Sequence, residues 1–292
     1  MFNNQALGVE TRGSLGRGVE KDVDESVHKN YDIYHDEFYK FKKDNSAIRN
    51  YRASDEESLM RDERFIGLFN DVRKIVDKIS LAGHDDLVTI GIGSAQSKEG
   101  NSTVSILIAL VAAAMQNGYH GNAEAANELV VFDKGANKKP VLLIDAQFKK
   151  PIIHKKFRIN AKPGLGDFLS NGVSYPQIIN HISPSLKVIT VGENKNLMLA
   201  NRHIDKFKSL LDYLRPQYNH IFIDIPPLMQ DAEALRFSEL CDGMILTINT
   251  GSTRWEVLHE AKKMLHKIHV PLIGGILNKR KHYIPSWLYN TL

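Results

Sequence analysis

A loop of small residues joins a strand-like run to a helix-like run at residues 88–113, which read VTIGIGSAQSKEGNSTVSILIALVAA. The pattern predicts a helix that begins at Ser102 or Thr103, just after Gly100. Such a loop directs backbone N–H groups and the positive end of a helix dipole to one point, which suits an anion. Aligned with the Walker A phosphate loop, the chain keeps this glycine and the hydroxyl of Ser102, but Asn101 stands where the motif has lysine. Taken alone, the segment is also compatible with an ordinary strand–turn–helix with a capping hydroxyl.

Two aspartates close strand-like runs further along the chain: Asp145 ends VLLID and Asp224 ends HIFID. In a parallel sheet both would emerge at the carboxyl edge, beside the phosphate loop. Magnesium prefers hard oxygen ligands, and an aspartate at a strand end commonly holds this ion or its waters. One such aspartate is often only a helix cap, but two beside this loop favour a nucleotide site. We therefore expect ATP or ADP with Mg²⁺, and Ser102, Asp145 and Asp224 as the candidate metal residues.

Composition and charge exclude several classes of protein. The chain has 292 residues, 38 Lys+Arg against 34 Asp+Glu, and a net charge of +4, with both signs interleaved along most of its length. No nucleic-acid partner is expected, since binding would need a clustered basic face. The single cysteine, Cys241, excludes a disulfide framework and fits a cytoplasmic protein. The lysine pairs 149–150 and 155–156 could meet phosphates or acidic lipids, although a solvated surface is the simpler interpretation.

The remaining pattern predicts a doubly wound, mostly parallel α/β sheet flanked by helices, as in P-loop NTPases. Residues 1–54 have few aliphatic side chains and are expected to form a flexible arm, and residues 55–292 the folded domain. The longest apolar run, residues 104–115, is too short for a bilayer span, so any membrane role would come through a partner. The strand-like runs are 87–92, 140–145, 186–191, 220–225, 243–248 and 271–277, with helical stretches between most of them and an amphipathic helix before the first.

The succession of motifs resembles the bacterial tyrosine kinases (BY-kinases) of exopolysaccharide and capsule synthesis, which are related to the MinD/ParA P-loop ATPases. The motifs that carry the resemblance are SAQSKEGNST, VLLIDAQFKKPIIHKKF, GLGDFL, IFIDIPPLMQDAEAL, CDGMILTINTGSTRWEVLHEA and IGGILNKR, in this order over about residues 60–292. The resemblance implies the fold of that family and a cytoplasmic role at the inner membrane. The implied partner is the cytosolic segment of a membrane polysaccharide co-polymerase, a chain-length regulator. Homo- or hetero-oligomers are also compatible with it.

The resemblance also implies roles for individual residues. Residues 100–103 match the phosphate loop, Asn278 matches an adenine-contacting asparagine, and Asp145 and Asp224 match the catalytic and magnesium-binding acids of the two Walker motifs. Three departures stand out: Asn101 replaces the lysine, Gln147 replaces a second aspartate, and the tail has only two tyrosines, Tyr283 and Tyr289, in place of a tyrosine cluster.

These departures lower the expected activity. A missing lysine removes positive charge where the transferred phosphoryl group concentrates negative charge. Such a charge can lower the activation free energy by several kcal/mol. An amide such as that of Gln147 is neutral and cannot act as a base. The sequence therefore predicts a degenerate kinase-like protein that regulates or scaffolds polysaccharide export. Two alternatives remain: an active tyrosine autokinase in which Lys98 replaces the lysine, and a MinD/ParA-like positioning ATPase or nucleotide-free interaction domain. Gln96 weighs against the positioning ATPase, which would carry a signature lysine there.

Overall fold

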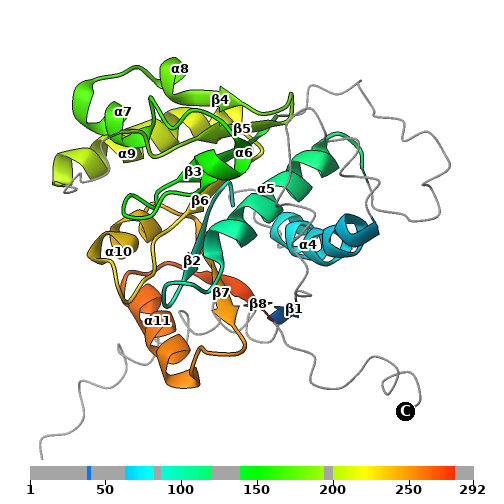
Figure 1. Ribbon diagram of the computed structural model, residues 1–292. Helices are drawn as coiled ribbons and strands as arrows, with labels where there is room; N and C mark the ends of the chain where they lie inside the picture. The colour runs from blue at the N-terminus through cyan, green and yellow to red at the C-terminus, as the bar shows by residue number, and fades with distance from the viewer. Residues whose placement is uncertain (1–37, 41–62, 82–86, 120–138, 194–199, 280–292) are drawn as a thin grey trace, which may run out of the picture. The chain divides into compact units, whose positions relative to one another are not determined.

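The computed structural model describes residues 38–40, 63–81, 87–119, 139–193 and 200–279. These residues form an eight-stranded sheet with helices on both faces (Figure 1). The strand order is β1-β8-β7-β2-β6-β3-β5-β4, and every neighbouring pair is parallel except β5 and β4. The predicted doubly wound, mostly parallel α/β fold is thereby confirmed.

The elements have the following bounds. The strands are β1 (Phe38–Lys40), β2 (Thr89–Ser94), β3 (Val141–Asp145), β4 (Ile179–His181), β5 (Leu186–Ile189), β6 (His220–Asp224), β7 (Gly243–Asn249) and β8 (Leu272–Asn278). The helices are α4 (Glu63–Leu81), α5 (Asn101–Gln116), α6 (Ile153–Phe157), α7 (Leu165–Asn171), α8 (Tyr175–Ile178), α9 (Asn201–Leu214), the 3-10 turn η3 (Arg215–Gln217), α10 (Ala232–Ser238) and α11 (Trp255–Lys267).

Strand β2 lies in the middle of the sheet, between β6 and β7. All residues of β2, β3 and β6 are buried, as expected for strands covered on both faces. Strands β6 and β3 are neighbours, and their register places Asp145 directly opposite Asp224. The sheet therefore brings the end of β2, which leads into α5, next to both predicted acidic strand ends.

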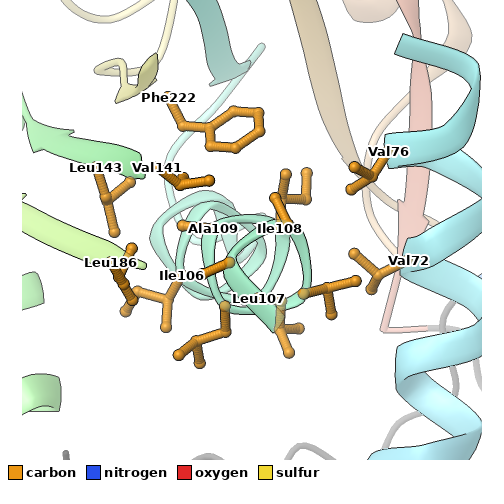
Figure 2. Packing of buried hydrophobic residues seen from close by; sticks show 14 of the residues in the cluster. Val72, Val76, Ile106, Leu107, Ile108, Ala109, Val141, Leu143, Leu186 and Phe222 are labelled. Atoms are coloured by element: carbon orange, nitrogen blue, oxygen red, sulfur yellow. The ribbon is translucent and has the colours of Figure 1, made fainter. Parts of the chain in front are cut away.

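Two layers of helices complete the core. Helices α4, α5 and α6 pack on one face of the sheet, and α7 to α11 pack on the other. Helix α5 is apolar around most of its circumference because it is enclosed on several sides. Figure 2 shows this packing: Val72 of α4 lies to one side of α5, and Val141 and Leu186 of the sheet lie to the other. The helix that begins beside the predicted phosphate loop is thus held firmly against the sheet.

Some elements differ from the sequence-based expectation. Strand β1 falls inside the segment 1–54 that was predicted to be a flexible arm, and it pairs with β8 from Phe38↔Gly275 to Lys40↔Leu277. The rest of that segment lies outside the described residues. The short antiparallel strand β4 was also not predicted, because its three residues are too few to show a period. Among the described residues, no helix is long and apolar enough to cross a bilayer.

Candidate functional site

The loop between β2 and α5 has a backbone that depends on a glycine. Gly100, the residue before α5, has φ 95°, in the left-handed region that L side chains rarely adopt. A Cβ atom built there would lie 2.1 Å from Nδ2 of Asn278. Lys98 is also left-handed, with φ 67°, although it has a side chain. The loop therefore turns tightly into the helix, and α5 begins where the sequence predicts, within one or two residues.

A buried carboxylate fixes the inside of this loop. Oε2 of Glu99 accepts a hydrogen bond from the backbone N–H of Gln96 at 3.2 Å, and Oε1 accepts one from the Thr253 hydroxyl. Burial raises the pKa of Glu99, and these two donors oppose the rise. Sequence reasoning missed both Glu99 and Thr253. Their separation of 154 residues leaves no local signal for the contact.

Asn278, the predicted adenine contact, is buried beneath the same loop. Its Nδ2 donates to the backbone oxygen of Glu99 at 2.9 Å, and its Oδ1 accepts from the backbone N–H of Lys279 at 2.8 Å. In this structure Asn278 therefore links the end of β8 to the loop. That Asn278 contacts the adenine of a bound nucleotide stays a prediction.

The residue at the lysine position, Asn101, bonds back into the protein. Its Nδ2 lies 2.7 Å from Oδ1 of Asp224 and 2.9 Å from both the Ile92 and Ile225 backbone oxygens. Its Oδ1 accepts from the hydroxyl of Thr247 at 3.3 Å. The side chain is 6% exposed. Asn101 thus ties the first turn of α5 to the ends of β2 and β6 and to the neighbouring strand β7.

The two predicted acidic residues lie below the site and are fully buried. Oδ1 of Asp145 accepts from the Gln147 N–H at 3.0 Å, and Oδ2 accepts from the Ile153 N–H at 3.3 Å. Oδ1 of Asp224 also accepts from the Ser105 hydroxyl at 3.1 Å. Oδ2 of Asp224 is buried and has no hydrogen-bond partner among the described residues.

Their burial alters how the two carboxyl groups titrate. Burial raises the pKa of Asp145 to about 6. The pKa of Asp224 is raised well above its usual value, first by burial and then by the negative charge of Asp145. Two adjacent buried carboxylates are costly when both are charged, so near neutral pH the pair favours holding a proton.

A cleft with a volume of about 360 Å³ opens above the loop. The predicted phosphate-loop residues Gly100, Asn101, Ser102 and Thr103 line it, whereas Asp145, Asp224 and Asn278 do not. The rest of the lining is Ser94, Ser97, Lys98, Glu99, Gln147, Lys149, Lys150, Ile152, Pro227, Gln230 and Asp231. The structure therefore brings the loop residues together at one open site and places the acidic pair underneath it.

Three lysines, Lys98 of the loop and Lys149 and Lys150 after β3, line this cleft and give it positive charge. Nζ of Lys149 lies 3.0 Å from Oδ2 of Asp231, the residue that caps α10. Lys150 is exposed and forms no ion pair within the described part of the chain. Gln147 also lines the cleft, and its Nε2 donates to the Ile225 backbone oxygen at 3.0 Å. The lysines suit an anionic ligand. At position 147 the cleft presents a neutral amide in place of a carboxylate that could act as a base.

The chain is similar in sequence to bacterial tyrosine-protein kinases, although no family model matches it. The tyrosine-protein kinase YwqD of Bacillus subtilis is 32% identical over 161 residues, which are 54% of this chain and 66% of YwqD. The tyrosine-protein kinase CpsD of Streptococcus agalactiae is 26% identical over 224 residues, which are 75% of this chain and 84% of CpsD. The chain is homologous to the bacterial tyrosine-protein kinases. It spans only 19% of a longer relative, the kinase ptk of Acinetobacter johnsonii.

Several solved structures share the fold, and two of the three named below are kinase domains. The chimerical protein CapA2B2 matches with a TM-score of 0.65 and 20% identity, covering 90% of this chain and 100% of that one. The kinase domain of Escherichia coli tyrosine kinase ETK matches with a TM-score of 0.61 and 20% identity, covering 75% and 78%. The kinase domain of VpsO matches with a TM-score of 0.58 and 24% identity, covering 77% and 98%. At these identities the likeness extends to the fold alone.

Proposed function

We propose that this chain is a degenerate tyrosine-kinase-like protein of exopolysaccharide biosynthesis, with weak or no phosphotransfer. It regulates or scaffolds a membrane polysaccharide co-polymerase and works in the cytoplasm, held at the inner membrane by that partner. Homology to bacterial tyrosine-protein kinases supports the class of protein. A P-loop-like cleft supports retained nucleotide binding.

The observation that carries the loss of phosphotransfer is the bonding of Asn101. Catalysis of phosphoryl transfer depends on positive charge placed at the transferring group. The Asn101 amide is neutral, and both of its N–H donors point into the protein, toward Asp224 and the Ile92 and Ile225 carbonyl oxygens. It therefore supplies neither the charge nor the reach of the absent lysine.

A second neutral side chain weakens the site further. Gln147 stands at the cleft where the family pattern has an aspartate, and its amide donates to the Ile225 backbone oxygen. An amide is not a general base, so it cannot accept the proton of an attacking hydroxyl. The two replacements act on the same reaction, so restoring one alone should recover less activity than restoring both.

Incubation with Mg-ATP, followed by detection of phosphotyrosine, tests this proposal. We expect no signal from the wild-type chain, and a signal from the variant that combines Asn101→Lys with Gln147→Asp. Asn160→Lys is the matched control, because it adds the same charge at an exposed asparagine. Tyrosine phosphate on the wild-type chain would refute the proposal and support the autokinase, with Lys98 of the cleft as the replacement cation. The candidate acceptors Tyr283 and Tyr289 lie outside the described residues.

The partner is tested separately. Co-expression with the cytosolic segment of the co-polymerase from the same polysaccharide locus should give a complex that co-elutes in size-exclusion chromatography. Separate elution at micromolar concentrations of both proteins would refute the scaffold role and leave the phosphotransfer result unaffected.

A further inference from the structure

The acidic pair offers few free oxygens to a magnesium ion. Oδ1 of Asp224 already accepts from Asn101 and from the Ser105 hydroxyl, and both oxygens of Asp145 accept from backbone N–H groups. Both side chains are fully buried, and neither lines the cleft. A divalent cation needs several oxygen ligands around one open position. Of the three residues expected to bind the metal, only Ser102 lines the cleft.

Asn101 lies between Asp224 and the cleft, because it lines the cleft and its Nδ2 reaches Oδ1 of Asp224 at 2.7 Å. Oδ1 also accepts from Ser105, so Asp224 could offer a cation only Oδ2, which is buried and has no hydrogen-bond partner among the described residues. One carboxylate oxygen outside the cleft lining is fewer than the several oxygen ligands that a divalent cation takes.

Positive charge reaches the cleft from another segment. Residues 146–166 contain six of the chain's 38 basic residues and none of its 34 acidic ones. Two of the six, Lys149 and Lys150, line the cleft together with Lys98 of the loop. Asp231 holds Lys149 in place, whereas Lys150 has no ion-pair partner among the described residues. Lysine ammonium groups of this kind bind phosphates as compact point charges.

We propose that the cleft binds a phosphorylated ligand as its metal-free anion, with Lys149 and Lys150 in place of the divalent cation. The loop N–H groups at the start of α5 contact the phosphate from one side, and the two lysines neutralise it from the other. The inference rests on the proposed function in one respect, that this cleft is the nucleotide-binding site. It does not depend on whether the protein transfers phosphate. Of the two lysines after β3, Lys150 should have the larger effect on binding, because Lys149 already shares its charge with Asp231.

Calorimetric titration with ATP tests the inference, once in excess Mg²⁺ and once in EDTA. We expect dissociation constants that agree within twofold. Lys150→Ala should weaken binding about tenfold in both buffers. Lys155→Ala is the matched control: it removes the same charge from an exposed lysine of the same segment that does not line the cleft, and should change binding less than twofold.

Three results would overturn the inference: binding at least tenfold tighter with Mg²⁺, equal losses for the Lys150 and Lys155 variants, or no binding in either buffer. None of them alters the phosphotyrosine assay. The converse also holds, since tyrosine phosphate on the wild-type chain would refute the proposed function whatever the titrations give. Inorganic pyrophosphate, titrated in EDTA, shows whether the phosphates alone account for the binding, as this geometry requires. Failure of pyrophosphate to compete with ATP would contradict the phosphate assignment.

Discussion

Nδ2 of Asn101 lies 2.7 Å from Oδ1 of Asp224, so the first residue of α5 is hydrogen-bonded to the last residue of β6. A charged side chain would interact with that aspartate through an ion pair, whereas the amide binds it as a neutral donor. The same amide reaches the backbone oxygens of Ile92 and Ile225, and its own oxygen accepts from Thr247. One residue thus joins the ends of three adjacent strands to the helix. Asn101 is therefore a structural contact of the fold.

Substitution of Asn101 by alanine tests how much this contact stabilises the fold. Asn101→Ala removes one donor from a buried carboxylate oxygen and two carbonyl oxygens, each of which keeps a second donor: the Ser105 hydroxyl for Asp224, the Ile225 N–H for Ile92, and Nε2 of Gln147 for Ile225. Loss of these buried hydrogen bonds should lower the free energy of unfolding by about 1–2 kcal/mol in urea denaturation at pH 7. Asn160→Ala is the control: it removes an exposed asparagine and should change stability by less than about 0.5 kcal/mol. Equal effects of the two substitutions would show that the Asn101 contacts contribute little.

Gly100 gives a second test, which concerns the loop and Asn278. Gly100→Ala forces a side chain into the left-handed region and places its Cβ 2.1 Å from Nδ2 of Asn278. Gly172→Ala is the matched control, because Gly172 has φ 70° but no atom within 4 Å of an added Cβ. The control should lose about 1 kcal/mol from backbone strain alone, and Gly100→Ala should lose at least about 2 kcal/mol more.

A double substitution separates the clash from the strain. Combining Gly100→Ala with Asn278→Ala should destabilise the protein less than the sum of the single changes, because the second removes the group that the new Cβ meets. Additive losses would mean that the loop moves away from Asn278 when the Cβ is introduced.

Sequence reasoning found the fold and part of the site, and the limits have physical causes. Buried strands with β-branched runs have a clear signal, so β2, β3, β6, β7 and β8 begin and end within about two residues of the expected positions. The loop residues 100–103 line the cleft, and their role in binding phosphate stays a prediction.

The contacts beneath the loop could not be found in this way. A motif match gives residue types in order, but it does not say whether a side chain faces the ligand or the core. Asp145 and Asp224 stand at their expected strand ends, yet neither lines the cleft, whereas Asn101, which is hydrogen-bonded to Asp224, does. Lys150 was considered mainly as part of a solvated surface, and only its place in the cleft lining indicates a role in binding. Both facts depend on tertiary contacts between distant segments.

The acidic pair predicts an unusual dependence of stability on pH. Burial raises the pKa of Asp145 from its ordinary value of 3.8 to about 6, so the folded state binds a proton that the unfolded state releases between these two pH values. The stabilising effect of this group is therefore complete below about pH 4 and is lost as the pH rises through about 6. A shift of this size corresponds to about 3 kcal/mol, and the raised pKa of Asp224 acts in the same direction.

Asp224→Asn isolates this effect from that of the other carboxyl groups. The variant keeps an oxygen for Asn101 and Ser105 and places an uncharged amide group at the Oδ2 position, which has no partner in the described structure. We expect the variant to gain at least about 1 kcal/mol relative to the wild type between pH 5 and 8, because one buried charge is gone. Urea denaturation of both proteins at several pH values from 4 to 8 measures the difference. A difference that stays constant across this range would mean that Asp145 and Asp224 do not share a raised pKa.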